Sequence, residues 1–203
     1  MISADPLVLA TRNQGKLNEL ARILGADIRL AGLDAFPGAP DVPETGATFE
    51  ANALLKARAV AAYTKLPAVA DDSGLCVDAL NGMPGVLSAR WAGRHGDDDA
   101  NLQLLIAQIA DVPDARLGAR FVCAAALVVP ADGGPREWVV TGQVEGRLIR
   151  APKGSGGFGY DPIFLPEGSK ETTAEMTPDA KDAISHRGRA FRALAPFITG
   201  RHP

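Results

Sequence analysis

The residues best suited to chemistry lie in a few short polar segments, and the first is a pair of adjacent carboxylates. Asp71 and Asp72 follow the apolar run 66–70 and precede Ser73 and Gly74. Two neighbouring acids after a buried strand are unfavourable unless a cation or a catalytic role compensates their desolvation and repulsion. Mg²⁺ prefers oxygen ligands and binds one or two carboxylates together with substrate phosphates. The pair therefore indicates a metal or catalytic site, although the same four residues also suit an ordinary turn.

A second segment is the loop 154–162, which combines four glycines with Phe158, Tyr160 and Asp161. Glycine lets the backbone take left-handed conformations and approach a ligand closely. An aromatic ring and an acid among glycines suit a planar, hydroxylated ligand such as a nucleoside. We expect one ring to pack in the core and the other to stack on a base.

Basic residues follow this loop as Lys181 and the sequence Ser185-His186-Arg187. Their donors suit the exocyclic oxygens of a base, or phosphate. A histidine next to an arginine is also common at surfaces and helix starts, so this cluster gains its weight from the other segments.

The segment 11–16 joins an apolar strand to a helix. It is not a P-loop, because Ala10 and Leu17 stand where that motif needs glycine and serine or threonine. Free N–H groups at a helix start, with the threonine, asparagine and lysine of this segment, could still bind phosphate oxygens. The alternative is a surface helix with a solvated lysine.

Composition limits the class of protein. With 203 residues, of which 46% are hydrophobic, we expect one domain over 1–203 with a sizeable core, shaped as two lobes. The net charge of −3 argues against non-specific nucleic-acid binding. Cys76 and Cys123 lie in apolar runs, which favours buried, reduced thiols. No apolar run is long enough to span a membrane, so we expect a soluble, cytoplasmic protein with no membrane or nucleic-acid partner.

Hydrophobic periodicity predicts an α/β fold. Expected strands cover 7–10, 66–70, 121–129, 138–141, 144–149 and 163–165, with at most one more in the proline- and glycine-rich segment 32–46. Expected helices cover 17–24, 48–63 and 98–111, and two more follow Thr177 and Ser185. Late strands joined by short turns indicate a mixed sheet. The acidic pair would then lie at the end of a strand, where open α/β sheets place their sites.

Six segments, taken in order, resemble the inosine/xanthosine triphosphate pyrophosphatase family: 9–16, 44–53, 70–75, 84–90, 156–162 and 183–188. The resemblance implies an elongated mixed central sheet flanked by helices, with a nucleotide cleft between two lobes, and a homodimer. It also implies Mg²⁺-dependent hydrolysis of ITP, dITP and XTP to the nucleoside monophosphate and pyrophosphate. Such an activity keeps deaminated purines out of DNA and RNA.

Carried over by position, the resemblance implies roles for individual residues. Asp72 would be the metal ligand and proton acceptor, Glu44 a second metal ligand, and Asp71 and Lys16 further catalytic groups. The triphosphate contacts would be Thr11, Arg12, Asn13, Gln14, Gly15 and Lys16, with Ser73 beside the acids. The nucleoside contacts would be Phe158, Gly159, Tyr160, Asp161, Lys181, His186 and Arg187. Among these, Phe158 would stack on the purine, and His186 and Arg187 would read the base.

The chain departs from the family pattern at Arg12, Pro43, Ala51 and Trp91. Pro43 replaces an acid, which leaves Glu44 as the one clear carboxylate of its loop. Two other classes share part of these features. A related pyrophosphatase for modified pyrimidine nucleotides would share the metal chemistry but not Ser185-His186-Arg187. A regulatory nucleotide-binding module would have no use for the acidic pair.

Overall fold

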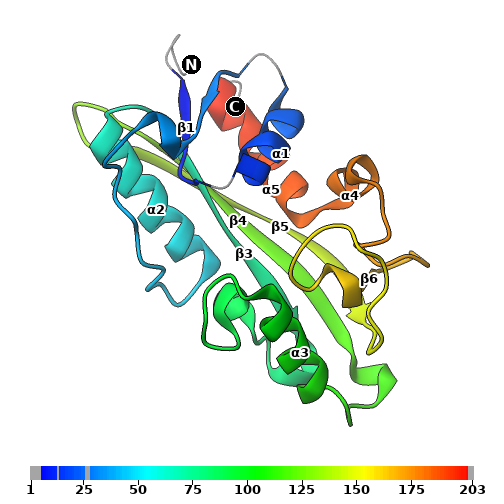
Figure 1. Cartoon of the computed structure of the whole chain (residues 1–203). Coiled ribbons are helices and arrows are strands. Elements are labelled where there is room, and N and C mark those ends of the chain that lie inside the picture. The colour runs from blue at the N-terminus through cyan, green and yellow to red at the C-terminus, as the bar shows by residue number, and fades with distance from the viewer. Residues whose placement is uncertain (1–5, 13, 26–27, 201–203) are drawn as a thin grey trace. The chain divides into compact units, whose positions relative to one another are not determined.

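The computed structural model describes residues 6–12, 14–25 and 28–200, so Asn13, a predicted triphosphate contact, lies outside the described residues. A six-stranded sheet has the strand order β2-β1-β3-β4-β5-β6 and is flanked by helices (Figure 1). β1 pairs in parallel with β2 and β3, whereas β5 and β6 are antiparallel, so the predicted mixed α/β sheet is confirmed. The strands are β1 Leu7–Leu9, β2 Leu30–Ala31, β3 Ala68–Val77, β4 Gly118–Val129, β5 Arg136–Leu148 and β6 Phe164–Pro166.

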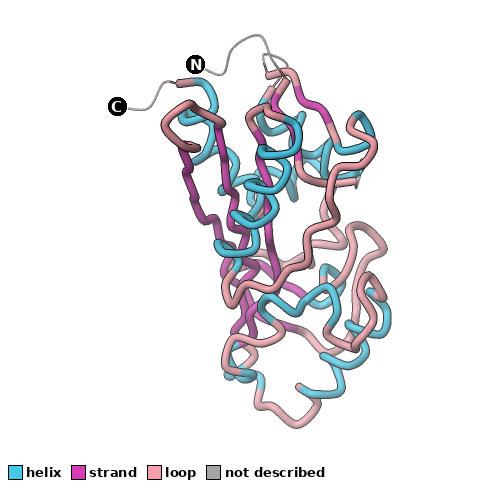
Figure 2. The backbone as a smooth tube through the Cα atoms, turned by 90° about the vertical axis from the view of Figure 1, so that its left-hand side faces the viewer, coloured by secondary structure: helices cyan, strands magenta, loops and turns pink. Residues whose placement is uncertain are grey.

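The helices occupy the predicted segments (Figure 2). They are α1 Gln14–Leu24, α2 Phe49–Thr64, α3 Asp98–Gln108, α4 Pro178–Ile184 and α5 His186–Thr199. Thr48 caps α2 by accepting the N–H of Ala51 at 3.2 Å, and Thr177 caps α4 with Pro178 at the first helical position. Both caps satisfy N–H groups that have no partner inside the helix. Within the described part of the chain, no helix has the length and apolar character needed to cross a membrane.

The chain divides into two compact units. The first unit comprises Met1–Asp72, Cys123–Gly142 and Arg187–Pro203, and the second comprises Ser73–Val122 and Gln143–His186. Each unit has its own apolar core. The core of the first is built from Leu7, Leu9, Leu20, Val69, Cys123, Ala125, Leu127, Ala190, Phe191, Leu194 and Ile198. The core of the second includes Leu75, Val77, Leu102, Leu105, Ile109, Leu117, Val144, Leu148, Tyr160, Ile163 and Phe164. Both cysteines are buried free thiols, as predicted.

Three predictions about strands were wrong. β3 does not end before the acidic pair but runs through it, so Asp71 and Asp72 lie in the middle of a strand. The separate strands predicted at 138–141 and 144–149 are one strand, β5, because Gly142 continues the extended backbone without a break. In the segment 32–46 the backbone forms a short 3₁₀ turn, Leu33–Ala35, and the extra strand lies just before it, as β2.

Candidate functional site

The acidic pair lies in a fully buried stretch of β3, with both side chains almost inaccessible to solvent. Side chains of consecutive strand residues point to opposite sides of the strand. Asp71 and Asp72 accordingly contact different side chains of the first unit. Two adjacent carboxylates therefore occupy two separate electrostatic environments.

Asp71 is clamped by two cations. The ammonium of Lys16 lies 3.2 Å from Oδ2, and both Nε and Nη2 of Arg187 donate to the same oxygen at 3.2 Å. Burial opposes ionisation of Asp71, but the charges of Lys16 and Arg187 outweigh it and hold the pKa well below the ordinary carboxyl value. Arg187 is buried and also donates to Glu19 of α1 at 2.8 Å. Asp71 therefore stays ionised, and its position is held from α1 and α5.

Asp72 faces α2 instead. The side-chain amide of Asn52 donates to Oδ2 at 2.9 Å, and the ammonium of Lys56 lies 3.8 Å from Oδ1. Burial raises the pKa of Asp72 to about 6, against the opposing charge of Lys56 and with a further upward contribution from Glu44. A carboxyl with a pKa near neutrality can accept and release a proton under physiological conditions.

The predicted metal ligands Asp72 and Glu44 already share one cation, because Lys56 also lies 2.6 Å from Glu44. The Glu44 loop is held to the site by Asn52, whose Oδ1 accepts the N–H of Gly46 at 2.7 Å. A Cβ on Gly46 would lie only 2.7 Å from that oxygen, so glycine is required there. Among the residues that the structure describes, no three His, Cys, Asp or Glu side chains gather into a metal site of their own. Two carboxylates fit a divalent cation whose remaining ligands are phosphate oxygens and water.

The predicted triphosphate segment reaches this site through Lys16. Thr11 lies between β1 and α1 and is partly buried, whereas Gln14 and Gly15 are exposed in the first turn of α1. Arg12 does not point to the acidic pair, because its guanidinium donates to the carbonyl of Ala39 at 2.9 Å. Ser73 follows Asp72 in β3 and is partly buried.

The glycine loop 154–162 belongs to the second unit. As predicted, one of its two aromatic rings is buried and the other is available to solvent. Tyr160 is buried, with only 5% of its surface exposed, and its hydroxyl donates to the carbonyl of Ser88 at 2.9 Å. Phe158 is 60% exposed. The ammonium of Lys181 lies 5.1 Å from the centre of the Phe158 ring, within range of a cation–π interaction.

Asp161 holds this loop together from a buried position. Its Oδ2 accepts the N–H of Phe158 at 2.8 Å and lies 2.5 Å from the Lys181 ammonium, and Thr173 donates to Oδ1 at 2.7 Å. A Cβ on Gly157 would come within 2.1 Å of Oδ2, in a backbone with a φ of 74°. Glycine at position 157 therefore allows the backbone to approach the Asp161 carboxylate closely.

His186, the last residue of the second unit, stacks on the ring of Phe121 with a centroid distance of 5.0 Å and an interplanar angle of 13°. Phe121 in turn makes an edge contact with Phe164 at 4.7 Å. Two aromatic residues of the sheet therefore support the predicted base-reading histidine. Arg187 was predicted to read the base together with His186. In the structure, all three of its side-chain nitrogens donate to Asp71 or Glu19.

Three residues contribute more than the sequence predicted. Asn52 entered only as part of a motif, and Lys56 and Glu19 had no assigned role, yet each binds a predicted site residue. Asn52 and Lys56 are four residues apart on α2, which puts them on one face of the helix. In the sequence, the available indication of this role was a lysine four residues after Asn52 in an otherwise alanine-rich helix.

The Ham1 family profile matches residues 7–197. The dITP/XTP pyrophosphatase of Streptomyces coelicolor is 64% identical over 195 residues, which cover 95% of this chain and 96% of that protein. The dITP/XTP pyrophosphatase of Nocardia farcinica is 61% identical over 196 residues, covering 95% and 94%.

Solved structures of similar proteins have the same fold. The crystal structure of the nucleoside-triphosphatase / dITP/XTP pyrophosphatase from Mycobacterium abscessus has a TM-score of 0.78 and 57% identity, and covers 95% of this chain and 100% of that one. The Staphylococcus aureus Ham1 protein has a TM-score of 0.87 and 38% identity, with 98% and 100% covered.

Proposed function

Because this chain belongs to the Ham1 family, we propose that it hydrolyses ITP, dITP and XTP to the nucleoside monophosphate and pyrophosphate. Relatives that match over nearly the whole chain are named dITP/XTP pyrophosphatases. The observation that carries the proposal is the acidic pair of β3, in which one carboxylate stays charged and its neighbour titrates near neutrality. Hydrolysis would remove deaminated purines from the nucleotide pool before a polymerase uses them.

In the proposed reaction, water attacks the α-phosphorus, the bond from that phosphorus to the pyrophosphate oxygen breaks, and the water proton passes to Asp72. A general base works best when its pKa lies near the working pH, and in the metal-free protein burial raises the pKa of Asp72 to about 6. Lys16 stabilises negative charge on the departing pyrophosphate. Asp71 supports this step by holding the Lys16 ammonium.

The proposed cofactor is Mg²⁺, with Asp72 and Glu44 as its protein ligands. When bound, the ion neutralises charge on the phosphate oxygens. Asn52 keeps these carboxylates in place, since its amide joins Asp72 to the backbone of the Glu44 loop. Lys56 offsets part of the charge of both carboxylates.

Most of the groups proposed for the nucleoside belong to the second unit, whereas Arg187 belongs to the first. Phe158 would stack on the purine, and Asp161 and Lys181 would hold the loop and the nucleoside. His186 and Arg187 would read the base. Inosine and xanthosine carry an acceptor oxygen at C6, whereas adenosine carries an amino donor, which would face another donor. An unmet pairing of this kind costs roughly 1 to 3 kcal/mol.

Arg187 gives this assignment a direct test, because its donors now contact Asp71 and Glu19. If Arg187→Ala leaves the preference for ITP over ATP unchanged, base reading belongs to other residues. The predicted nucleotide cleft, homodimer and cytoplasmic location stay predictions.

Pyrophosphate release from ITP, dITP, XTP, GTP and ATP, with and without Mg²⁺, tests the function. We expect release from the first three, dependent on Mg²⁺. Release from modified pyrimidine nucleotides alone would identify a related pyrophosphatase instead. A protein that binds nucleotides and releases no pyrophosphate would be a regulatory module.

A further inference from the structure

A carboxylate outside the predicted site holds the loop that carries Phe158. Asp98, the first residue of α3, accepts the N–H of Gly159 on Oδ2 at 3.1 Å. Asp161 accepts the preceding N–H, that of Phe158 itself, at 2.8 Å. Two consecutive N–H groups are thus held by carboxylates from different parts of the chain.

Hydrogen bonds matter here because packing holds little of this segment. Residues 151–158 are exposed, and a Cβ on Gly159 would meet no heavy atom within 4 Å. The backbone of Gly159 also has a φ of 57°, a conformation that favours glycine. Besides Asp98, the residues that hold the Phe158 ring are Asp161, the buried Tyr160 and Lys181, whose ammonium lies 5.1 Å from the ring centre.

We propose that Asp98 is a positioning residue for base recognition, which acts by fixing the peptide that follows Phe158. The inference rests on the proposed function, in which Phe158 stacks on the purine. A ring held in its binding orientation loses less conformational freedom when the base stacks on it. Asp98 therefore affects the binding of the base, whereas the phosphate chemistry belongs to Lys16 and the acidic pair.

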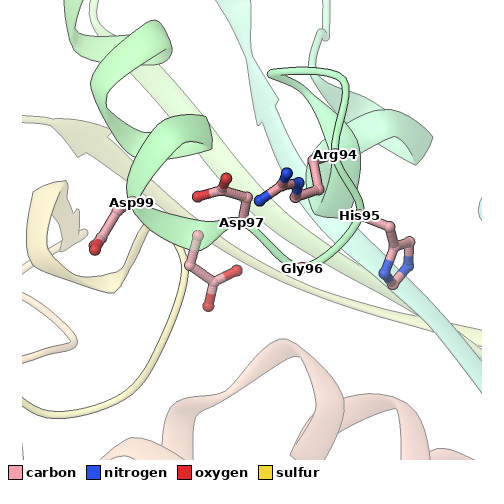
Figure 3. Close-up of a pocket in the computed structure, with 6 residues that line it drawn as sticks. Arg94, His95, Gly96, Asp97 and Asp99 are labelled. Atoms are coloured by element: carbon pink, nitrogen blue, oxygen red, sulfur yellow. The ribbon is translucent and has the colours of Figure 1, made fainter.

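The acids beside Asp98 supply a matched control. Asp97, Asp98 and Asp99 line a surface pocket of about 440 Å³ together with Arg94, His95 and Gly96 (Figure 3). Asp97 caps α3 by accepting the N–H of Ala100 at 3.2 Å, so its substitution would disturb the helix. Asp99 points away from Arg94 in Figure 3 and makes no hydrogen bond to the loop in the described structure. Asp99→Ala removes the same charge from the same helical turn, which controls for the helix dipole.

The experiment compares Asp98→Ala, Asp98→Asn and Asp99→Ala with the wild type. Hydrogen exchange of the Gly159 amide is measured by NMR, and kcat and KM are measured for dITP. For Asp98→Ala we expect faster exchange at Gly159 and a KM raised about 5- to 30-fold with kcat within about 2-fold. Asp98→Asn keeps an acceptor oxygen, so its Gly159 exchange rate and its KM should lie close to those of the wild type. Asp99→Ala should resemble the wild type in both quantities.

Equal exchange rates and KM values for Asp98→Ala and Asp99→Ala overturn the inference while the proposed function stands. If the wild type does not hydrolyse dITP, the proposed function fails and the inference fails with it. Should Asp98→Ala fold poorly, Asp98→Ser carries the same comparison, because serine keeps a polar side chain beside the Asp97 cap but is shorter than the carboxylate that reaches Gly159. Unchanged Gly159 exchange in Asp98→Ser also overturns the inference.

Discussion

Asp71 and Asp72 are joined by one peptide bond, yet their pKa values are shifted in opposite directions. Asp71 faces Lys16 and Arg187, and its pKa is held below the ordinary value despite burial. Asp72 is buried beside Glu44 and the ammonium of Lys56, and burial raises its pKa to about 6. The alternation of a β-strand is enough to create this difference. Asparagine at either position should therefore change stability with opposite sign.

Asp72→Asn should stabilise the metal-free protein while removing most activity. The folded pKa lies above the unfolded value of about 3.9, so ionisation of Asp72 weakens folding as the pH rises from about 4 to about 6. Above pH 6 we expect the variant to gain up to about 3 kcal/mol in the free energy of unfolding, and the gain should vanish near pH 4. Urea denaturation from pH 4 to 8 without divalent metal measures it. Turnover of dITP should fall about 10²- to 10⁴-fold.

Asp71→Asn should destabilise the protein instead. The stability that Asp71 provides is present above its unfolded pKa near 3.9 and is lost as the pH falls toward its lower folded value. The substitution leaves Lys16 and Arg187 without their shared partner, at a cost of about 3 to 5 kcal/mol near pH 7. The same urea titration provides the check, with Asp72→Asn as its control. A variant as stable as the wild type would contradict the described ion pairs.

At the scale of elements, local patterns predicted the helices well and the strands less well. Caps such as Thr48 and Thr177 mark helix starts in the sequence itself. Asp, Ser and Gly are depleted in strands, so 71–74 indicated a turn or the end of a strand. β3 continues there because Asp71 and Asp72 find cationic and amide partners inside the fold. These partners are distant in sequence, and no local pattern reveals them.

Part of the site could not be predicted either, because its residues are also distant from one another in the sequence. Glu19 becomes significant only because α5 brings Arg187 to it, across most of the length of the chain. Lys56 becomes significant only beside Glu44 and Asp72. By contrast, residue types and their immediate neighbours predicted that one ring of the loop 154–162 packs in the core, whereas the choice of Phe158 as the other ring came from the family resemblance.

Two glycines of the base loop allow a sharp test at this scale. Gly157 and Gly159 both have a positive φ, so alanine at either position carries a strain of about 1 to 2 kcal/mol. Only at Gly157 would the new Cβ collide with Asp161, whereas at Gly159 it meets open space. We expect Gly157→Ala to raise the KM for dITP at least about 10-fold more than Gly159→Ala. Steady-state kinetics measures the KM of both variants. Equal KM values would contradict the prediction, because they would mean that the contact between the new Cβ at position 157 and Asp161 does not disturb the loop.

At the scale of the whole molecule, the two units differ in the chemistry they contain. The first unit holds Lys16, Glu44 and the acidic pair, which suit phosphates and a divalent cation. The second unit holds Phe158, Asp161 and Lys181, which suit a nucleoside. Each group rests on a separate core.

Fragments of the substrate should therefore perturb different amides. Inosine should shift the NMR signals of 156–161 and 181–186, whereas pyrophosphate with Mg²⁺ should shift those of 14–16 and 70–72. The reason is that each fragment offers only one of the two chemistries. A chemical-shift titration with each fragment measures this, and adenosine serves as the control for the base. Because Arg187 contacts Asp71, the decisive signal is that of Asp72, and a shift at Asp72 with inosine alone would contradict the assignment.

Beyond its first residue, α5 follows every residue of the second unit, and it supplies Phe191, Leu194 and Ile198 to the core of the first unit. It also brings Arg187 to Asp71. During synthesis, which proceeds from the N-terminus, every residue of the second unit precedes Arg187, while the first unit still lacks this helix. A nascent chain that has not yet reached α5 can thus complete only the core of the second unit. The unit with the hydrolytic groups becomes complete only after every residue of the second unit has been synthesised.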